Sequence, residues 1–433
     1  MSTFGELAMR MGKQSDDALV LSLKKWYMSK DNYKEKLSRL ERELLYSYDA
    51  KNLLPRQVDA LYPNGINTSV SRLERYARCP FSYFIEYTLK AKERKILKIG
   101  APDIGTIMHA VLEDFTNKIA RDNIAWSNID ESYAEALIGA ILDEMGEKIL
   151  GASSLDTKAT KYILQRLRSN LIRCAKLLVM HIASGRFEPV GSEITFGDNG
   201  KISAVVVDIA SGKKLKIHGM IDRVDKCETD DGVYYRVIDY KSGSKSFSLE
   251  SIYNKLDLQL VLYLEAAMQG KNDAKPAGML YFNIREPMIK TDFKISDDEA
   301  ASALKNSMKL DGLILNDAEI VRDMDRNFEN GSEFLPVKMT SSGEIRINSS
   351  LATMSQFKIL SDYVKSSLKQ IGNSIAGGKI DIMPYRNSVS STCAYCGYKS
   401  VCKFDVSRSK SGYRMCQKAS AADVWDMMRE EVR

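Results

Sequence analysis

Residues 219 to 243 read GMIDRVDKCETDDGVYYRVIDYKSG, and the rest of the chain is interpreted outward from this stretch. The alternation of side chains predicts a strand from Val233 to Lys241. A second strand is predicted from Leu215 to Asp225, and Asp231-Gly232 is a dipeptide typical of a tight turn between strands. The stretch therefore predicts a β-hairpin.

Two carboxylates and one amine gather in this hairpin. Asp239 and Lys241 share one face of their strand, and a two-residue turn places Asp222 opposite Lys241 and diagonal to Asp239. Carboxylates bind Mg²⁺ or Mn²⁺, the metal lowers the pKa of bound water, and a lysine stabilises charge on phosphate. The patch indicates metal-assisted phosphodiester cleavage. The alternative is a solvated cross-strand ion pair, which is what a lone Asp-x-Lys usually forms.

Two predicted helices flank the hairpin in sequence. One begins at Gly105 and carries His109, and the other spans residues 256–268, with Gln259 and Tyr263 four positions apart on one face. The ordered motifs G-x-x-x-H, G-x-I-D-R-x-D, I-D-Y-K-S-G and Q-x-x-x-Y resemble the RecB-type branch of the PD-(D/E)xK nucleases. The resemblance implies an α/β fold with a restriction-endonuclease-like core, in which helices flank a mixed central sheet.

The resemblance also implies roles for individual residues. The implied ligands of Mg²⁺ or Mn²⁺ are His109, Asp222, Asp239 and the carbonyl of Tyr240. The implied catalytic residues are Asp222, Asp239, Lys241, Gln259 and Tyr263. Lys241 would orient the attacking water and stabilise the phosphate, while Gln259 and Tyr263 would position the DNA strand. Glu193 is either an additional acidic group of this site or a surface residue of a strand, and the pattern leaves both readings open.

Composition limits the possible functions. The chain has 433 residues, a formal net charge of +6 and seven cysteines. This charge is modest for the length, so any nucleic-acid surface is expected to be a local patch and not a bias of the whole chain. Without a long apolar run or a signal-peptide core we expect no membrane association and a cytoplasmic location. No G-x-x-x-x-G-K-[ST] motif occurs, so this chain is not expected to hydrolyse ATP.

Four regions are expected along the chain. Residues 1–66 form a helical lead-in, and 67–294 form the nuclease core. Residues 295–385 are polar and predicted to be a mostly helical elaboration, while 386–433 carry a cluster of cysteines that packs back on the core.

A basic and aromatic segment begins the nuclease core. Ser71 to Glu74 has the pattern of a capping box, and the helix that it starts is predicted to end at Cys79. Arg72, Arg75 and Arg78 alternate with aromatic residues, a mixture suited to phosphate contacts and base stacking. The alternative is an amphipathic helix whose charges are merely solvated.

The cysteines predict a second site. Cys393, Cys396 and Cys402 have C-x2-C-x5-C spacing, and a metal site needs a fourth ligand. Cys416 would complete a local zinc site, Cys79 a site spanning most of the chain, and spacing leaves both open. The R-C-P-F-S-Y-F segment together with C-x2-C-x5-C resembles the iron-sulfur staple of AddB-type subunits of bacterial helicase–nucleases. That resemblance implies a [4Fe–4S] cluster held by Cys79, Cys393, Cys396 and Cys402.

The family resemblance implies a function. It predicts a metal-dependent DNA exonuclease that processes double-strand-break ends for recombinational repair, cuts the 5′-ended strand and works with an AddA-type motor subunit. Members of the family are longer, so we expect this chain to be a fragment or a truncated gene product, with residues 1–66 as a remnant of a helicase-like region. The alternatives are a stand-alone CRISPR-adaptation-type nuclease and a DNA-binding scaffold with a vestigial site. The extra residues 295–385 disfavour the first alternative, and the intact acidic and lysine positions disfavour the second.

Overall fold

The structure is a computed structural model that describes most of the chain. Its continuous described ranges are residues 3–11, 17–44, 51–92, 101–150, 158–285, 309–328, 350–388, 390–407 and 412–433, with single residues and short stretches between them.

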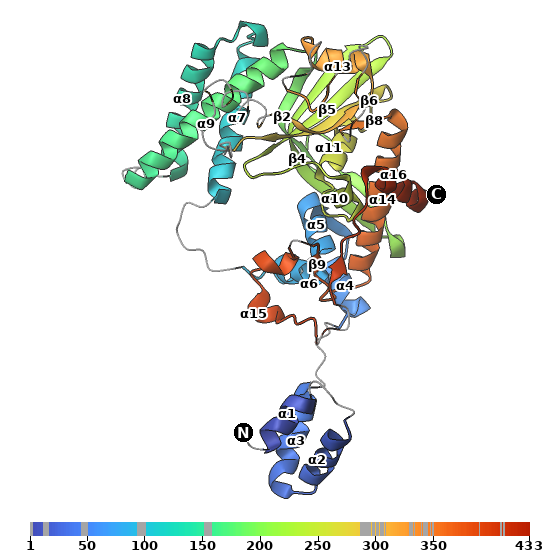
Figure 1. Ribbon diagram of the computed structural model, residues 1–433. Coiled ribbons are helices and arrows are strands. Elements are labelled where there is room, and N and C mark those ends of the chain that lie inside the picture. Colours follow the sequence, from blue (N-terminus) through green and yellow to red (C-terminus); the bar gives the residue numbers. More distant parts are fainter. Residues whose placement is uncertain are drawn as a thin grey trace.

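Three helices at the start of the chain form a small unit with its own core. They are α1 (Thr3–Met11), α2 (Ala18–Met28) and α3 (Asp31–Leu44). Their core consists of Leu7, Val20, Tyr27 and Leu37. Figure 1 shows these helices as a separate blue lobe. The short helix α4 (Pro55–Leu61) follows and begins with proline at its first position.

A mixed sheet forms the centre of the larger unit. Its strands are β1 (Ile66–Ser69), β2 (Glu188–Phe196), β3 (Val205–Asp208), β4 (Lys214–Thr229), β5 (Gly232–Lys241), β6 (Ala274–Asn283), β7 (Asp311–Leu315) and β8 (Leu351–Ala352). The order is β1-β4-β5-β6-β7-β8, and β2 and β3 also pair with β4. The β4–β5 and β6–β7 pairs are antiparallel, whereas β5–β6 and β7–β8 are parallel. The expected mixed central sheet is therefore confirmed.

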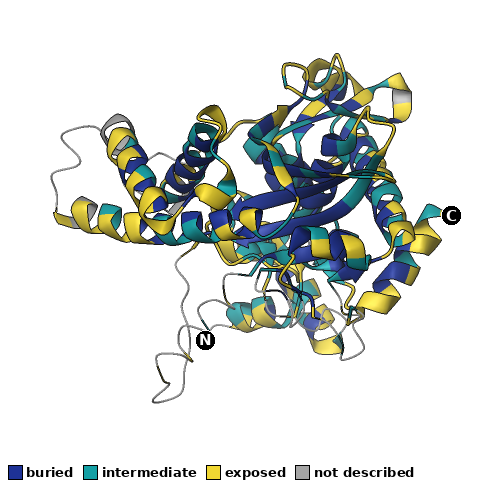
Figure 2. Ribbon diagram, turned by 90° about the horizontal axis from the view of Figure 1, so that it is seen from above, coloured by how far each residue is buried: buried dark blue, intermediate teal, exposed yellow. Residues whose placement is uncertain are grey.

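Burial explains the residue types found in the central strands. The middle of each strand is buried on both faces, with seven of ten residues buried in β5 and six of ten in β6, which favours the β-branched and aromatic side chains found there. Figure 2 shows these strands in dark blue at the middle of the molecule, with helices around them that are exposed on their outer sides.

Helices surround the sheet. The longer ones are α5 (Val70–Arg78), α7 (Ala101–Arg121), α8 (Glu131–Leu150), α9 (Lys158–Ala183), α11 (Gln259–Met268), α14 (Met354–Ala376) and α16 (Ala421–Val432). Helix α11 packs on β5 and β6, α14 packs on α11, and α7 to α9 form a group that meets the sheet at β2. Within the described part of the chain, none of the helices combines the length and apolar character needed to cross a membrane.

Shorter elements complete the fold. They are α6 (Pro80–Tyr83), η1 (Phe84–Thr88), η2 (Trp126–Asn128), η3 (Ala210–Gly212), α10 (Leu249–Tyr253), α13 (Ala318–Met324), η5 (Thr392–Tyr395), α15 (Lys399–Cys402) and the parallel strand pair β9 (Tyr385–Arg386) and β10 (Arg414–Met415).

The hairpin turn differs from the sequence prediction. Thr229 pairs with Gly232, so the turn residues are Asp230 and Asp231, one position earlier than expected. Gly232 has φ +143°, and a Cβ there would lie 2.9 Å from the carbonyl oxygen of Asp273. Glycine is required beside the turn because the backbone of a neighbouring loop approaches closely. The change of turn residues also shifts the β4–β5 register by two residues from the predicted one.

The predicted capping box is also wrong. Helix α5 begins at Val70 after Ser69, so Ser71 lies inside the helix instead of capping it. The Glu74 carboxylate accepts a hydrogen bond from the backbone N–H of Leu258, at 2.8 Å, far away in the sequence.

The region 295–385 contributes to the sheet. The prediction of a mostly helical segment missed β7 and β8, which extend the sheet beyond β6. The predicted boundaries of the four regions stay a prediction, since part of 286–349 lies outside the described residues.

Candidate active site

Three carboxylates form a row across three neighbouring strands. Glu193 lies on β2, Asp222 on β4 and Asp239 on β5. The pairings one residue away on both sides of β4 place Glu193 and Asp239 opposite Asp222 on its two flanks. The sequence predicted Asp222 and Asp239 on the same face of the sheet. The structure places them there despite the changed register, because a shift of two residues leaves each side chain on its original face. The predicted pairing of Asp222 with Lys241 is wrong: Asp222 faces Asp239.

Helix α7 brings a histidine to this row. His109 Nδ1 lies 3.5 Å from Asp222 Oδ2, and ligand atoms of His109, Glu193 and Asp222 all lie within 4.8 Å of one another. The helix can approach because it has Gly105 one turn earlier, where a Cβ would be 2.8 Å from the Ser242 hydroxyl. Nitrogen and carboxylate ligands in this arrangement fit a divalent cation such as Mg²⁺ or Mn²⁺.

Electrostatics support a cation at the same place. Burial raises the pKa of Asp239 to about 7, and the charge of Asp222 adds to the effect while Lys241 opposes it. Burial likewise raises the pKa of Glu193 to about 7, with further contributions from Asp222 and Glu113. Crowded, desolvated carboxylates repel one another, and a bound divalent cation would relieve that repulsion.

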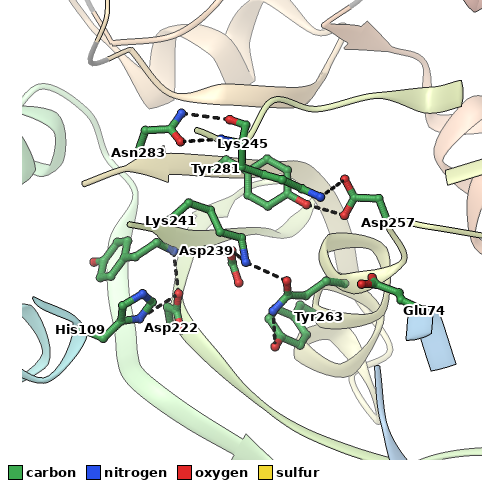
Figure 3. A network of polar contacts seen from close by, with 12 residues as sticks. Glu74, His109, Asp222, Asp239, Lys241, Lys245, Asp257, Tyr263, Tyr281 and Asn283 are labelled. Atoms are coloured by element: carbon green, nitrogen blue, oxygen red, sulfur yellow. Dashed lines mark hydrogen bonds and ion pairs between the residues drawn. The ribbon is translucent and has the colours of Figure 1, made fainter. Parts of the chain in front are cut away.

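The lysine of the site is held by two partners (Figure 3). Lys241 Nζ lies 2.5 Å from Asp239 Oδ2 and donates to Gln259 Oε1 at 2.8 Å. Gln259 Nε2 in turn lies 2.7 Å from the hydroxyl oxygen of Tyr263. The Asp239 side chain is only 2% exposed, so this is not the solvated surface ion pair considered as an alternative.

The backbone next to the lysine is held as well. Tyr240 donates its backbone N–H to Asp222 Oδ2 at 2.6 Å, which fixes the Asp222 carboxylate against β5. The structure therefore brings the predicted residues together: His109, Asp222, Asp239, Tyr240, Lys241, Gln259 and Tyr263. Their individual roles stay predictions.

Sequence reasoning missed a second group beside the lysine. Asp257 Oδ2 lies 3.0 Å from Lys245 Nζ, and its Oδ1 accepts a hydrogen bond of 2.7 Å from Tyr281. The Tyr281 ring centre lies 5.5 Å from Lys241 Nζ, and Figure 3 shows Glu74 below Asp257, on the side away from His109. Contacts between α5, β6 and the loop before α11 have no local signature in sequence.

The second aspartate of G-x-I-D-R-x-D has a structural role. Asp225 is fully buried and accepts hydrogen bonds from Arg223 at 2.6 Å and from Arg236 at 2.8 Å. The Arg236 guanidinium also lies 4.6 Å from the ring centre of Phe187. This network ties β4 to β5 beneath the carboxylate row.

The three arginines predicted to bind DNA all have partners within the chain. Arg72 lies over the Tyr87 ring at 5.0 Å, Arg75 Nη2 lies 2.9 Å from Glu86 Oε2, and Arg78 Nη2 donates to the Leu256 carbonyl at 3.4 Å. DNA contact by these arginines stays a prediction.

Four of the cysteines converge on one cavity. Cys79, Cys393, Cys396 and Cys402 all line a pocket of about 160 Å³. Burial raises the pKa of Cys402 to about 11, and the neighbouring thiols of Cys79, Cys393 and Cys396 raise it further. Cys416 is not among the lining residues, and its Sγ lies 2.9 Å from Glu250 Oε1. Of the two fourth ligands left open by spacing, the fold brings Cys79 to the other three.

Comparisons with known proteins agree with this geometry. The family model of the PD-(D/E)XK nuclease superfamily matches residues 67–403, and the chain belongs to that family. This confirms the fold class that the four motifs predicted.

Individual relatives show which members of the family the chain resembles. The chain is similar to the B subunit of the ATP-dependent helicase/deoxyribonuclease of Acetivibrio thermocellus, with 35% identity over 412 residues. It is 36% identical over 418 residues to the protein of the same name from Clostridium tetani. These matches cover 94% and 95% of the chain, and each covers 36% of the relative. The expected likeness to the nuclease portion of such subunits is confirmed, and the chain spans about a third of the length of these relatives.

Proposed function

We propose that this chain is a metal-dependent DNA exonuclease and acts as the nuclease part of a helicase–nuclease complex. The single observation that carries the proposal is the row of Glu193, Asp222 and Asp239, flanked by His109 on one side and Lys241 on the other. The alternative of a scaffold with a vestigial site is disfavoured, because every position of this set keeps its functional group.

His109, Glu193 and Asp222 would hold the metal ion, with Asp239 and the Tyr240 carbonyl as further ligands. When bound, Mg²⁺ or Mn²⁺ lowers the pKa of a bound water and polarises the phosphate. The protein's own contribution is to place charge. Lys241 presents its ammonium at the edge of the carboxylate row, where it faces the phosphate.

Gln259 and Tyr263 keep that ammonium in place. The Gln259 side chain accepts from Lys241 and bonds Tyr263, so its rotamer is fixed at both ends. A fixed lysine has less orientational freedom to lose when the reaction begins, which is the advantage of a preorganised site. The same two side chains form the wall along which we expect the DNA strand to lie.

We also propose that Cys79, Cys393, Cys396 and Cys402 hold a [4Fe–4S] cluster. Support comes from their shared cavity and from the separate partner of Cys416. Thiolates are the ligands of such clusters.

The wider setting is proposed from the relatives. Their names denote a helicase and a deoxyribonuclease, which supports a DNA substrate, a motor protein of the AddA type as partner and a cytoplasmic location. We propose that the chain cuts the 5′-ended strand at double-strand breaks during recombinational repair.

One assay tests the proposed activity. Protein purified without oxygen would be given single-stranded DNA labelled at its 5′ or 3′ end, with Mg²⁺ and with or without a chelator. We expect degradation of the linear strand that stops with chelator, while a closed circular strand survives. The order in which the two labels are released gives the polarity. Metal-independent cleavage, or none, would contradict the proposal.

A further inference from the structure

Helix α5 is fastened to the segment that precedes α11. Residues 254–258 connect α10 to α11, and three polar side chains link them to α5. Glu74 accepts from the Leu258 N–H, Arg78 donates to the Leu256 carbonyl, and Arg414 donates to both the Ala77 and Asn254 carbonyls. Of these contacts, the one made by Glu74 lies nearest to α11, because it reaches the residue directly before the helix.

The position of the Glu74 contact is informative. Leu258 is the residue that caps the start of α11, and its side chain is completely buried. Backbone N–H groups at a helix start have no partner within the helix, so an outside acceptor fixes where the helix begins. The Glu74 carboxylate supplies that acceptor from 184 residues away.

The next residue along the chain is Gln259, which holds Lys241. Because Leu258 and Gln259 are consecutive, fixing the Leu258 backbone also fixes the Cα of Gln259. The Gln259 amide then reaches Lys241 at 2.8 Å and Tyr263 at 2.7 Å. A continuous line of contacts therefore runs from α5 to the ammonium group of the site.

The Glu74 carboxylate lies in an electrostatically unfavourable place. Glu74 is partly buried beside Asp257, and burial followed by the Asp257 charge raises its pKa to about 7. Two neighbouring carboxylates in a poorly solvated place are unfavourable for stability alone. The Asp257 carboxylate has its own partners, Lys245 and Tyr281, so Glu74 is not needed to satisfy them.

We propose that Glu74 is a positioning residue for DNA cleavage, which sets the start of α11 so that Gln259 holds Lys241 toward the phosphate. The inference rests on the proposed nuclease function. It adds a residue that touches neither the metal ligands nor the substrate. It also makes α5, which is directly followed by Cys79, common to the cysteine cavity and the active site.

The test is a double-mutant cycle in the full chain. Glu74→Ala removes the acceptor, and we expect kcat for single-stranded DNA to fall about 10-fold, with KM changed less than about twofold. Glu74→Gln keeps an acceptor oxygen and is expected to recover most of the rate. In a Gln259→Ala background, Glu74→Ala is expected to cost less than about twofold more, because the line of contacts is already broken.

A second measurement does not depend on activity. Amide hydrogen exchange in the peptide covering residues 256–263 is expected to quicken in Glu74→Ala, while exchange in α8 stays the same. Glu431→Ala serves as the matched control, since it removes a carboxylate that accepts from Tyr253 in the neighbouring helix α10 and lies outside the site. It should alter neither cleavage nor exchange at residues 256–263.

The outcomes separate the two proposals. An inactive wild type whose exchange depends on Glu74 would overturn the nuclease function and keep the link between α5 and α11. An active wild type would overturn the role of Glu74 if Glu74→Ala cleaved equally well, if Glu74→Gln were as impaired as Glu74→Ala, or if the losses multiplied in the Gln259→Ala background.

Discussion

Glu193 has a backbone conformation that its residue type disfavours. Its φ is +49°, in the left-handed region, where any residue other than glycine has a conformational energy higher by on the order of 1 kcal/mol. The side chain nevertheless joins His109 and Asp222 instead of pointing to solvent. Strain of this kind persists where a function requires the position, which supports a role for Glu193 at the metal site.

Substitution of Glu193 should separate activity from stability. Glu193→Gly relieves the strained φ but removes a carboxylate, so we expect cleavage to fall about 10²-fold with a melting temperature close to that of the wild type. Glu193→Gln should likewise require more Mn²⁺ for half-maximal cleavage. Cleavage and thermal melting measured on the same samples test this. Full activity of Glu193→Gly would show that the carboxylate is not a ligand.

Asp239 and Lys241 are expected to act on the chemical step. Asp239→Ala and Lys241→Ala should each lower cleavage at least ~10²-fold with little loss of DNA binding, because both side chains act on charge that develops in the transition state. Single-turnover cleavage and binding to labelled DNA measure the two effects. Asp231→Ala, at the exposed hairpin tip, is the control and should cleave normally. Wild-type cleavage by either site variant would remove the assignment.

The sequence predicted which motif residues belong to the site, but it did not predict all the residues that contact them. Parity alone was enough to place Asp222 and Asp239 together, because a two-residue error in register leaves each side chain on its face. Parity could not decide Glu193, whose direction depends on an unusual φ. It could not decide Glu74 either, because a local capping pattern says nothing about a partner on another helix.

Among the elements, α5 has several partners at once. Its buried residues Leu73 and Tyr76 pack into the core, its polar side chains meet the start of α11, and its end leads to Cys79. The arginines on this helix have partners within the chain, yet each guanidinium has more donors than those contacts use. Contact between these unused donors and phosphate stays a prediction.

The arginines are tested by salt dependence. Arg72→Ala is expected to weaken binding of single-stranded DNA and to reduce the slope of log K against log salt by about one for each phosphate that the side chain neutralises. Arg75→Ala and Arg78→Ala should do the same, with some loss of stability because each also breaks an internal contact. Lys358→Ala, on the exposed part of α14, is the matched control. An unchanged slope in all three variants would show that these arginines are solvated charges that do not contact phosphate.

The elements themselves were predictable where periodicity was long. The β4–β5 hairpin and α11 were predicted because their periodic patterns are long, whereas α7 was predicted only from Gly105 onward and begins at Ala101. Strands β7 and β8 were missed because five- and two-residue apolar runs do not distinguish strand from helix. β7 becomes a strand because the edge of β6 offers backbone partners, and β8 in turn pairs with β7.

For the whole molecule, the four cysteines join distant parts of the chain. A tie between Cys79 and Cys393 closes a loop of roughly 300 residues, and chain entropy puts such a closure at about 5–6 kcal/mol. That is comparable with the free energy of unfolding of a whole domain, so loss of the tie is expected to lower the stability of the entire larger unit. The sequence offered two fourth ligands, and only the fold could bring Cys79 to the tail.

The cysteine site is tested by comparing two variants. Wild-type protein purified without oxygen should be brown, absorb near ~400 nm and contain about four irons per chain. Cys79→Ser should lose the colour and the iron and melt at a lower temperature, whereas Cys416→Ser should keep all three properties. Metal analysis, absorbance and thermal melting measure this. One zinc ion that depends on Cys416 would contradict the cluster.

The order of the four cysteines in the chain also affects how the protein is made. Cys79 leaves the ribosome long before Cys393, Cys396 and Cys402, and α5 must likewise wait for α11. A nascent chain can pair β4 with β5 early, since these strands are adjacent, but it cannot close the cavity until Cys393, Cys396 and Cys402 have emerged. The carboxylate row can therefore form first, α5 can meet α11 next, and the cysteine cavity closes last. A partly synthesised chain would thus have its metal ligands before Cys79 is joined to the other three cysteines.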